Sequence, residues 1–260
     1  MNTLAFTDDM ACLQRCTAES HDLVIRRGIV LGALNLRTGE RVLELGCGGG
    51  YYTYEAARFV GPTGRICAID ISLDQIAAAQ ARCAELAWVE CWQGDVSAPQ
   101  YGDAEFDTVF AVQVLEYLAD LDSALPHPPD AATRRAPHHR GHGVELGGVA
   151  LGECVTDAAG AGRIRAPFAC RDLPSILAAR LRWAGIQPLR QTAIPILNTS
   201  YSPASFSYWA ARVIRSFVVS RQAITEEEAA DWFEELAKLE ESGAYFFCLT
   251  PIMTESVKAG

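Results

Sequence analysis

The sequence RVLELGCGGG, from Arg41 to Gly50, decides the fold of this chain. Val42, Leu43 and Leu45 are short apolar residues that favour a buried parallel strand. The strand runs directly into glycines, and a helix-like pattern follows over residues 52–60. A strand, a glycine turn and a helix bring backbone N–H groups and a helix N-terminus close to a ligand. The stretch therefore predicts a βα turn that binds a ligand.

The spacing of the glycines decides between two kinds of ligand. A dinucleotide site needs the pattern G-x-G-x-x-G. That pattern fails in both registers, because Tyr51 and Thr53 stand where the third glycine is required. The chain instead has an acidic residue followed by three alternating glycines: Glu44, Gly46, Gly48 and Gly50. A glycine-rich turn without any ligand is the alternative interpretation.

This pattern resembles the first motif of the class I S-adenosylmethionine-dependent methyltransferases. The resemblance implies that the Glu44 carboxylate lies near the methionine ammonium of the cofactor. It also implies that the backbone of the turn, including Cys47, approaches the nucleoside.

Three further motifs of that family follow in order. A strand over residues 65–71 ends in Asp70 and Ile71, a strand over 88–93 precedes Gly94-Asp95-Val96, and a strand over 105–112 precedes Gln113. By resemblance, Asp70 accepts the ribose hydroxyls, for which a two-oxygen carboxylate is suited. The same resemblance assigns adenine packing to Ile71, the adenine amino group to Asp95 next to Val96, and the sulfonium region to Gln113. Asp70 as a helix cap is the alternative, but Ser72 and Gln75 already form a capping box.

The resemblance implies an α/β fold, a Rossmann-like doubly wound sheet of seven strands in the order 3-2-1-4-5-7-6 with the last strand antiparallel. Residues 1–260 are expected to form a single methyltransferase domain. A helix over 172–185, a sixth strand over 187–198 and a last strand over 244–252 complete it. The fifth strand is the doubtful one.

Two helical segments are expected to flank the substrate. Residues 1–36 form an N-terminal helical cap with a helical pattern over 8–34, and His21 is a weak candidate for a general base. Residues 200–243 form a helical insertion between the sixth and seventh strands, a candidate substrate lid lined by Tyr201, Tyr208 and Trp209. Tyr201 and Tyr208 are also weak catalytic candidates. The alternative is that His21 is solvated and that the aromatic side chains only pack the helices onto the domain.

Composition limits the partners. The formal charge is −10 without a basic patch, which disfavours a nucleic-acid backbone as partner. Nine cysteines without a C-x-x-C pair or a metal-ligand cluster indicate reduced thiols in a cytoplasmic protein and no metal. An arsenite-type acceptor would need paired thiols, which the spacing does not indicate. The N-terminus does not resemble a signal peptide, and no apolar run reaches the length of a membrane span.

The predicted function is transfer of a methyl group from S-adenosylmethionine to a small-molecule acceptor. A catalytically inactive protein of this fold, acting as a binding partner, is the first alternative, and an NAD-linked oxidoreductase is the second. The motifs indicate the cofactor and leave open the acceptor, the methylated atom, the catalytic base and the oligomeric state.

Residues 125–170 break the family pattern. They contain four of the five histidines and five of the twelve prolines, a composition typical of a linker. We hypothesise a frame-shifted segment, because codons for Asp130 to Glu145 shifted by one base can encode the turn and fifth strand that the family requires. A real insertion, with 143–152 as a poor fifth strand, is the alternative. Resequencing the gene tests this, and an unchanged reading frame in independent isolates would refute the hypothesis.

Overall fold

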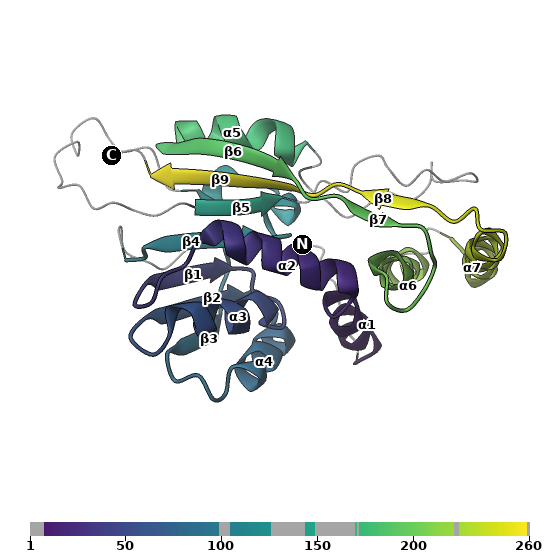
Figure 1. Cartoon of the computed structure of the whole chain (residues 1–260), viewed down its shortest axis with the longest axis horizontal. Coiled ribbons are helices and arrows are strands. Elements are labelled where there is room, and N and C mark those ends of the chain that lie inside the picture. The colour runs from purple at the N-terminus through teal and green to yellow at the C-terminus, as the bar shows by residue number, and fades with distance from the viewer. Residues whose placement is uncertain are drawn as a thin grey trace. The chain divides into compact units, whose positions relative to one another are not determined.

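The apolar strands predicted around the glycine turn form the centre of one sheet. The computed structural model describes residues 8–98, 105–125, 144–148, 170, 172–220 and 224–258. Its main sheet has the order β3-β2-β1-β4-β5-β9-β6 (Figure 1). The strands are β1 (Arg41–Leu45), β2 (Arg65–Asp70), β3 (Val89–Gln93), β4 (Thr108–Val112), β5 (Val144–Gly148), β6 (Ile186–Ala193) and β9 (Ile252–Lys258).

The strand directions are those of a doubly wound sheet closed by an antiparallel strand. β1 pairs in parallel with β2 and β4, β2 with β3, and β4 with β5. β9 is antiparallel to both β5 and β6. The predicted Rossmann-like α/β fold and its strand order are therefore confirmed, with β9 in the place of the expected seventh strand.

The doubtful fifth strand is present in the sheet. Val144–Gly148 pairs with β4 on one side and with β9 on the other. The remainder of the anomalous segment, residues 126–143 and 149–169, lies outside the described residues. The frame-shift hypothesis therefore stays a prediction.

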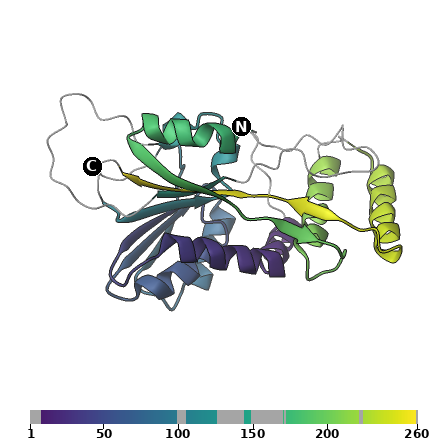
Figure 2. The same cartoon turned by 45° about the horizontal axis from the view of Figure 1, so that its top comes forward.

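Alternation along each central strand sends side chains to two different helical layers. Leu43, Leu45, Cys67 and Ile69 pack with α5 (Leu173–Trp183) and the short 3-10 helices η1 (Leu115–Tyr117) and η2 (Asp122–Ala124). Val42 and Ile66 pack with α2 (His21–Leu34) and α3 (Tyr51–Val60), and Ala68 packs with α4 (Leu73–Arg82). Figure 2 shows α5 on one face of the sheet and α3 and α4 on the other. This double cover buries both faces of the parallel strands, as their apolar composition requires.

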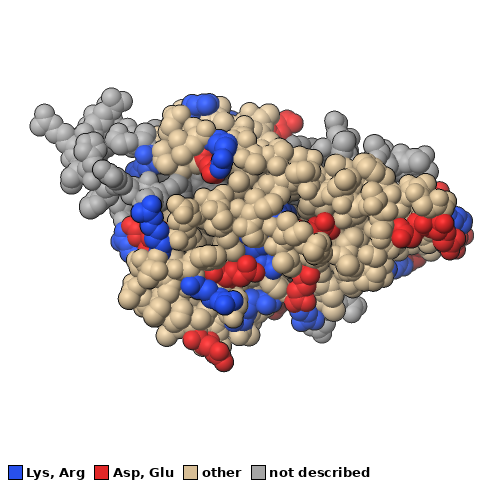
Figure 3. All heavy atoms as spheres, viewed as in Figure 1, with Lys and Arg blue, Asp and Glu red and all other residues tan. Residues whose placement is uncertain are grey.

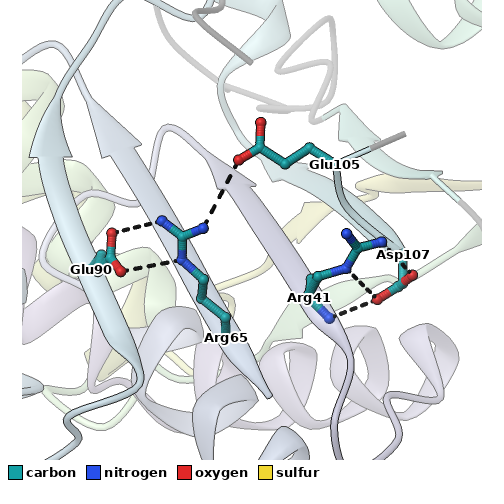
Figure 4. Close-up of polar contacts among 5 residues, drawn as sticks. All are labelled: Arg41, Arg65, Glu90, Glu105 and Asp107. Atoms are coloured by element: carbon teal, nitrogen blue, oxygen red, sulfur yellow. Dashed lines mark hydrogen bonds and ion pairs between the residues drawn. The ribbon is translucent and has the colours of Figure 1, made fainter. Parts of the chain in front are cut away.

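Ion pairs join the amino ends of the central strands (Figure 4). Arg41 at the start of β1 makes a bidentate pair with Asp107, whose oxygens lie 3.0 and 3.1 Å from the guanidinium nitrogens. Arg65 at the start of β2 pairs in the same way with Glu90 and lies 3.9 Å from Glu105. These pairs are exposed, so each contributes at most about 1 kcal/mol, and they leave the opposite, carboxyl ends of the strands for ligand binding.

The described chain divides into two compact units. Among the described residues, one unit contains the seven-stranded sheet and covers 29–98, 105–125, 144–148, 170, 172–194 and 251–258. The other covers 8–28, 195–220 and 224–250. The second unit contains α1 (Asp8–Ala18), the start of α2, α6 (Phe206–Ser220), α7 (Glu226–Glu241), and a two-stranded antiparallel sheet of β7 (Ile196–Asn198) and β8 (Phe247–Leu249). The prediction of a single domain with a cap and an insertion stays a prediction.

Asp22 organises the second unit. Its carboxylate accepts hydrogen bonds from the Asn198 side chain and from the backbone N–H of Phe206, at 2.9 and 2.7 Å. A charge at the first residue of α6 satisfies one of the N–H groups that a helix start leaves unpaired. α7 begins with a capping box between Thr225 and Glu228.

The helical pattern over 8–34 is confirmed as two helices that separate at Glu19 and Ser20. Two predicted strand boundaries are wrong. The predicted sixth strand over 187–198 divides into β6 and β7, and the predicted last strand over 244–252 divides into β8 and the start of β9. Pro195 and Pro251 lie at the two divisions, and proline cannot donate a hydrogen bond to a sheet.

On the face drawn in Figure 3, Lys and Arg side chains lie in small groups among Asp and Glu side chains and form no extended basic area. Within the described part of the chain, no helix is both long and apolar enough to cross a membrane.

Replacing Leu177 in α5 with Ala should destabilise the sheet-containing unit by about 2–5 kcal/mol, because the side chain is 1% exposed in the core beneath α5. Chemical denaturation monitored by circular dichroism measures the change. Leu189→Ala is the matched control, since this leucine of β6 is 62% exposed. Equal effects of the two substitutions would contradict the packing of α5 described above.

Candidate functional site: the carboxyl ends of strands β1 to β4

The turn after β1 can only be built from glycine at two positions. Gly46 and Gly50 have φ of +70° and +76°, a region that L-residues rarely adopt. A Cβ at Gly46 would lie 2.2 Å from a Val114 methyl group, and one at Gly50 would lie 2.8 Å from the Ala79 backbone. The glycines therefore let β4 and α4 approach the turn closely.

Asp70 holds this turn against the end of β2. Its Oδ2 accepts the Gly48 N–H at 2.9 Å, and its Oδ1 accepts the Ser72 N–H at 2.9 Å. The Asp70 carbonyl also accepts the Gly94 N–H at 3.0 Å, so the ends of β1, β2 and β3 converge on one residue. Ser72 caps α4 by accepting the Gln75 N–H, as the capping box predicts.

Glu44 lies beneath the turn and not on its surface. It is 2% exposed, and its Oε2 accepts a hydrogen bond from the Thr53 hydroxyl at 2.5 Å. Burial raises the pKa of Glu44 to about 8, although the Thr53 hydrogen bond acts in the opposite direction. A protonated carboxyl is therefore the resting state near neutral pH, and a nearby cation would favour its ionised form.

The other predicted residues lie around the same edge of the sheet. Ile71, directly after β2, is 57% exposed although it is a large apolar residue. Asp95 after β3 is exposed, and the hydroxyl and N–H of Ser97 lower its pKa through hydrogen bonds at 2.6 and 2.8 Å. Val96 is buried in the core, whereas Gln113 after β4 is half-buried with a φ of +57°.

Two residues that the sequence analysis did not single out complete the turn. Arg82 at the end of α4 donates from Nε to the Gly49 carbonyl at 2.8 Å, and its guanidinium lies 3.5 Å from the centroid of the Tyr51 ring. Thr53 is the other, through Glu44. Neither has a sequence signal, because both depend on how α3 and α4 pack. Burial raises the pKa of the Cys47 thiol well above its usual range, so this thiol stays protonated.

Comparison with known proteins agrees with this geometry. Residues 42–127 match the family model described as a methyltransferase domain. This segment contains the turn, Asp70, Asp95 and Gln113. About a third of the chain is therefore similar to a methyltransferase domain.

Known proteins are also similar to a part of this chain. An uncharacterised protein of transposon TN4556 from Streptomyces fradiae is 35% identical over 99 residues, which are 38% of this chain and 29% of that protein. Nocamycin O-methyltransferase from Saccharothrix syringae is 34% identical over 94 residues, which are 35% of this chain and 34% of that enzyme. The similar region thus spans about a third of the length of these relatives.

A solved structure extends the likeness of fold. The S-adenosylmethionine-dependent methyltransferase from Geobacter sulfurreducens, in complex with S-adenosylhomocysteine, aligns with a TM-score of 0.55 at 18% identity. The alignment covers 98% of this chain and 99% of that one. At this identity the similarity shows the fold alone.

The weak catalytic candidates belong to the unit that lacks the methyltransferase turn. His21 lies on a cavity of about 440 Å³, together with Trp209 and Val24. Its backbone N–H donates to the Ala204 carbonyl at 3.0 Å. The remaining lining residues are Cys16, Glu19, Ser20, Pro203 and Ala204.

Tyr201 and Tyr208 surround a guanidinium and do not line this cavity. Arg212 donates to the Tyr201 hydroxyl at 3.0 Å and lies 3.4 Å from the centroid of the Tyr208 ring. Burial raises the pKa of Tyr201 in spite of Arg212, which makes its phenolate harder to form. The roles of His21, Tyr201 and Tyr208 stay predictions.

Two pairs of thiols lie close enough to affect each other's pKa: Cys12 and Cys16 on α1, and Cys83 and Cys91 between the end of α4 and β3. The first pair had a sequence signal in its spacing of four residues on a helix.

The stability of the protein should depend on the ionisation of Glu44. In the unfolded chain this carboxyl has a pKa near 4.5, and in the folded chain near 8, so folding takes up a proton between these values. Its contribution to stability is therefore complete below pH 4.5 and is lost as pH rises through about 8, by at most about 1.4 kcal/mol for each pH unit. Glu44→Gln should lose this component, and urea unfolding from pH 5 to 8 measures it.

The control is Glu234→Gln on α7, whose carboxyl is exposed. It should keep the pH dependence of the unaltered protein. A Glu44→Gln curve parallel to that of the unaltered protein would show that Glu44 is ionised in both states.

Proposed function

We propose that this chain binds S-adenosylmethionine at the carboxyl ends of β1 to β4 and transfers its methyl group to a small-molecule acceptor. The observation that carries the proposal is the Asp70 carboxylate, which fixes the glycine turn through Gly48 while lying next to the exposed apolar side chain of Ile71. A fixed carboxylate beside an exposed apolar surface suits a ribose joined to a flat base.

The residues at this edge fit the parts of the cofactor. Asp70 would bind the ribose, Ile71 and the backbone at Val96 the adenine ring, and Asp95 the adenine amino group. Glu44 would balance the methionine ammonium from beneath the turn, and Gln113 would border the sulfonium. The backbone of Gly46, Cys47, Gly48 and Gly50 would form the floor. The cofactor supplies an electrophilic methyl group on a positively charged sulfur.

The work left to the protein is to position the acceptor and exclude water. Holding two reactants in line can supply about 7–11 kcal/mol of a barrier of this kind. A base is needed only where the acceptor atom carries a proton, and His21, beside the cavity in the second unit, is the candidate. Tyr201 and Tyr208 are placed to support α6 through Arg212.

The net charge and the free thiols support the proposed class of acceptor and the proposed location of the protein. A formal charge of −10 favours a small molecule over a nucleic acid as acceptor. The eight cysteines within the described residues are thiols and not disulfides, which favours a cytoplasmic location.

Calorimetric titration with S-adenosylhomocysteine, with NAD as the control ligand, tests the proposal. Micromolar binding of the first ligand alone is the expected result. Binding of NAD alone would favour an oxidoreductase, and binding of S-adenosylhomocysteine without methyl transfer to any acceptor in a broad screen would favour an inactive binding protein.

Asp70→Asn should weaken S-adenosylhomocysteine binding by about 10- to 100-fold, because a charged hydrogen bond to a ligand contributes about 1.5–3 kcal/mol. The same titration measures the loss. Asp107→Asn is the matched control: it removes an aspartate paired with Arg41 at the opposite ends of the strands. Binding of S-adenosylhomocysteine to this control should be unchanged, and an equal loss in both variants would contradict the role of Asp70.

A further inference from the structure

Helix α1 presents two thiols on one of its faces. Cys12 and Cys16 are four residues apart in the sequence DDMACLQRCTA, so they lie one helical turn from each other. Burial and, after it, the neighbouring Cys12 thiol raise the pKa of Cys16, so the two thiols are close enough to interact. Cys12 is exposed and Cys16 is half-buried, and Cys16 also lines the cavity of about 440 Å³. The pair is therefore accessible to a small solute or ion.

The helix prevents this pair from closing into an ordinary disulfide. Residues four apart on a helix have Cβ atoms about 5–6 Å apart. A disulfide needs Cβ atoms about 3.5–4.5 Å apart. A metal ion bridges a larger gap, since two metal–sulfur bonds of about 2.3 Å each allow the sulfurs to lie up to about 4.6 Å apart. An intact α1 thus favours coordination over oxidation.

The number of ligands selects the ion. Among the residues that the structure describes, no group of three or more His, Cys, Asp or Glu side chains could hold a metal. A structural zinc site needs four ligands, so two thiols do not make one. Soft thiolates select Cu(I), which is stable with two sulfur ligands in a linear arrangement.

We propose that Cys12 and Cys16 form a two-coordinate site for a soft monovalent ion, Cu(I) or its analogue Ag(I). Binding is a ligand exchange: each S–H group loses its proton to the solvent as its sulfur forms a bond to the metal. No electron is transferred. The site belongs to α1 and is independent of the proposed methyl transfer.

Anaerobic titration of the reduced full chain with Cu(I), in competition with a coloured Cu(I) chelator, tests the site. The unaltered protein should bind one tight equivalent at α1. Cys12→Ser and Cys16→Ser should each weaken that equivalent by about 100-fold or more, because one thiol loses the advantage of a second ligand held nearby. Cys83→Ser should keep it, since this substitution removes one thiol from the other, more buried pair.

A variant with two thiols at a different spacing on α1 tests whether the number of thiols or their arrangement determines binding. The double variant Cys16→Ser with Gln14→Cys keeps two thiols on α1 but places them two residues apart, where side chains do not share a face. It should bind as weakly as the single variants while its helix content, measured by circular dichroism, is unchanged. Equal affinity of this variant and the unaltered protein would overturn the proposal.

Native mass spectrometry of the Ag(I)-loaded protein gives a second, independent readout. One ion per chain with the loss of two protons is expected, and a loss of one proton would overturn a bis-thiolate site. Titration of the same variants with S-adenosylhomocysteine keeps this test separate from the proposed function, because neither cysteine belongs to the methyltransferase turn. Loss of Cu(I) binding with normal S-adenosylhomocysteine binding would support the metal site whatever the acceptor is.

Discussion

The carboxylate of Asp70 is the constraint on which the candidate site depends. One oxygen holds the Gly48 N–H and the other holds the Ser72 N–H, so the turn after β1 and the start of α4 share one anchor. The turn needs that anchor because three of its glycines adopt positive φ values, a conformation with a large entropy cost to fix. Arg82 adds a second restraint from the end of α4, at the Gly49 carbonyl. Because both ends of α4 are linked to the turn in this way, the packing of α4 against the sheet also stabilises the backbone of the turn.

β1, β2 and β4 could be predicted from the sequence because both of their faces are covered by helices. β3 is a partly exposed edge strand, which alternation predicts. A strand covered on both sides by helices has a continuous apolar run that ends at a turn residue, and β1, β2 and β4 all have this form. β5 has no such signal, since its sequence is VELGG. Its place between β4 and β9 comes from pairing with two existing edges, which a local pattern does not contain. The prolines at 195 and 251 indicate where the predicted strands are interrupted. The apolar residues on either side of each proline nevertheless favoured one continuous strand.

The site residues also fall into two groups: those that a local sequence pattern predicts and those that depend on packing. Those that follow strand ends, such as Asp70, Asp95 and Gln113, could be placed together because parallel strands end at one edge of a sheet. The partners of Glu44 and of the Gly49 carbonyl could not, because Thr53 and Arg82 reach them only through the packing of α3 and α4. The Cys12 and Cys16 pair is the opposite case: its contact is local, and helix periodicity alone brings the thiols together.

The burial of Glu44 gives the turn a preference for charge as well as for shape. A buried carboxylate is costly, so without a cation the group stays protonated and the turn is nearly neutral at this point. A ligand with an ammonium and a sulfonium favours ionisation and gains attraction from it. A dinucleotide brings an anionic pyrophosphate to the same turn, where ionised Glu44 would repel it and neutral Glu44 would offer no compensating charge. Asp70 does not discriminate in this way, because both cofactors have a ribose that a carboxylate can accept. The choice between them therefore rests on Glu44, a buried acidic residue beneath the turn.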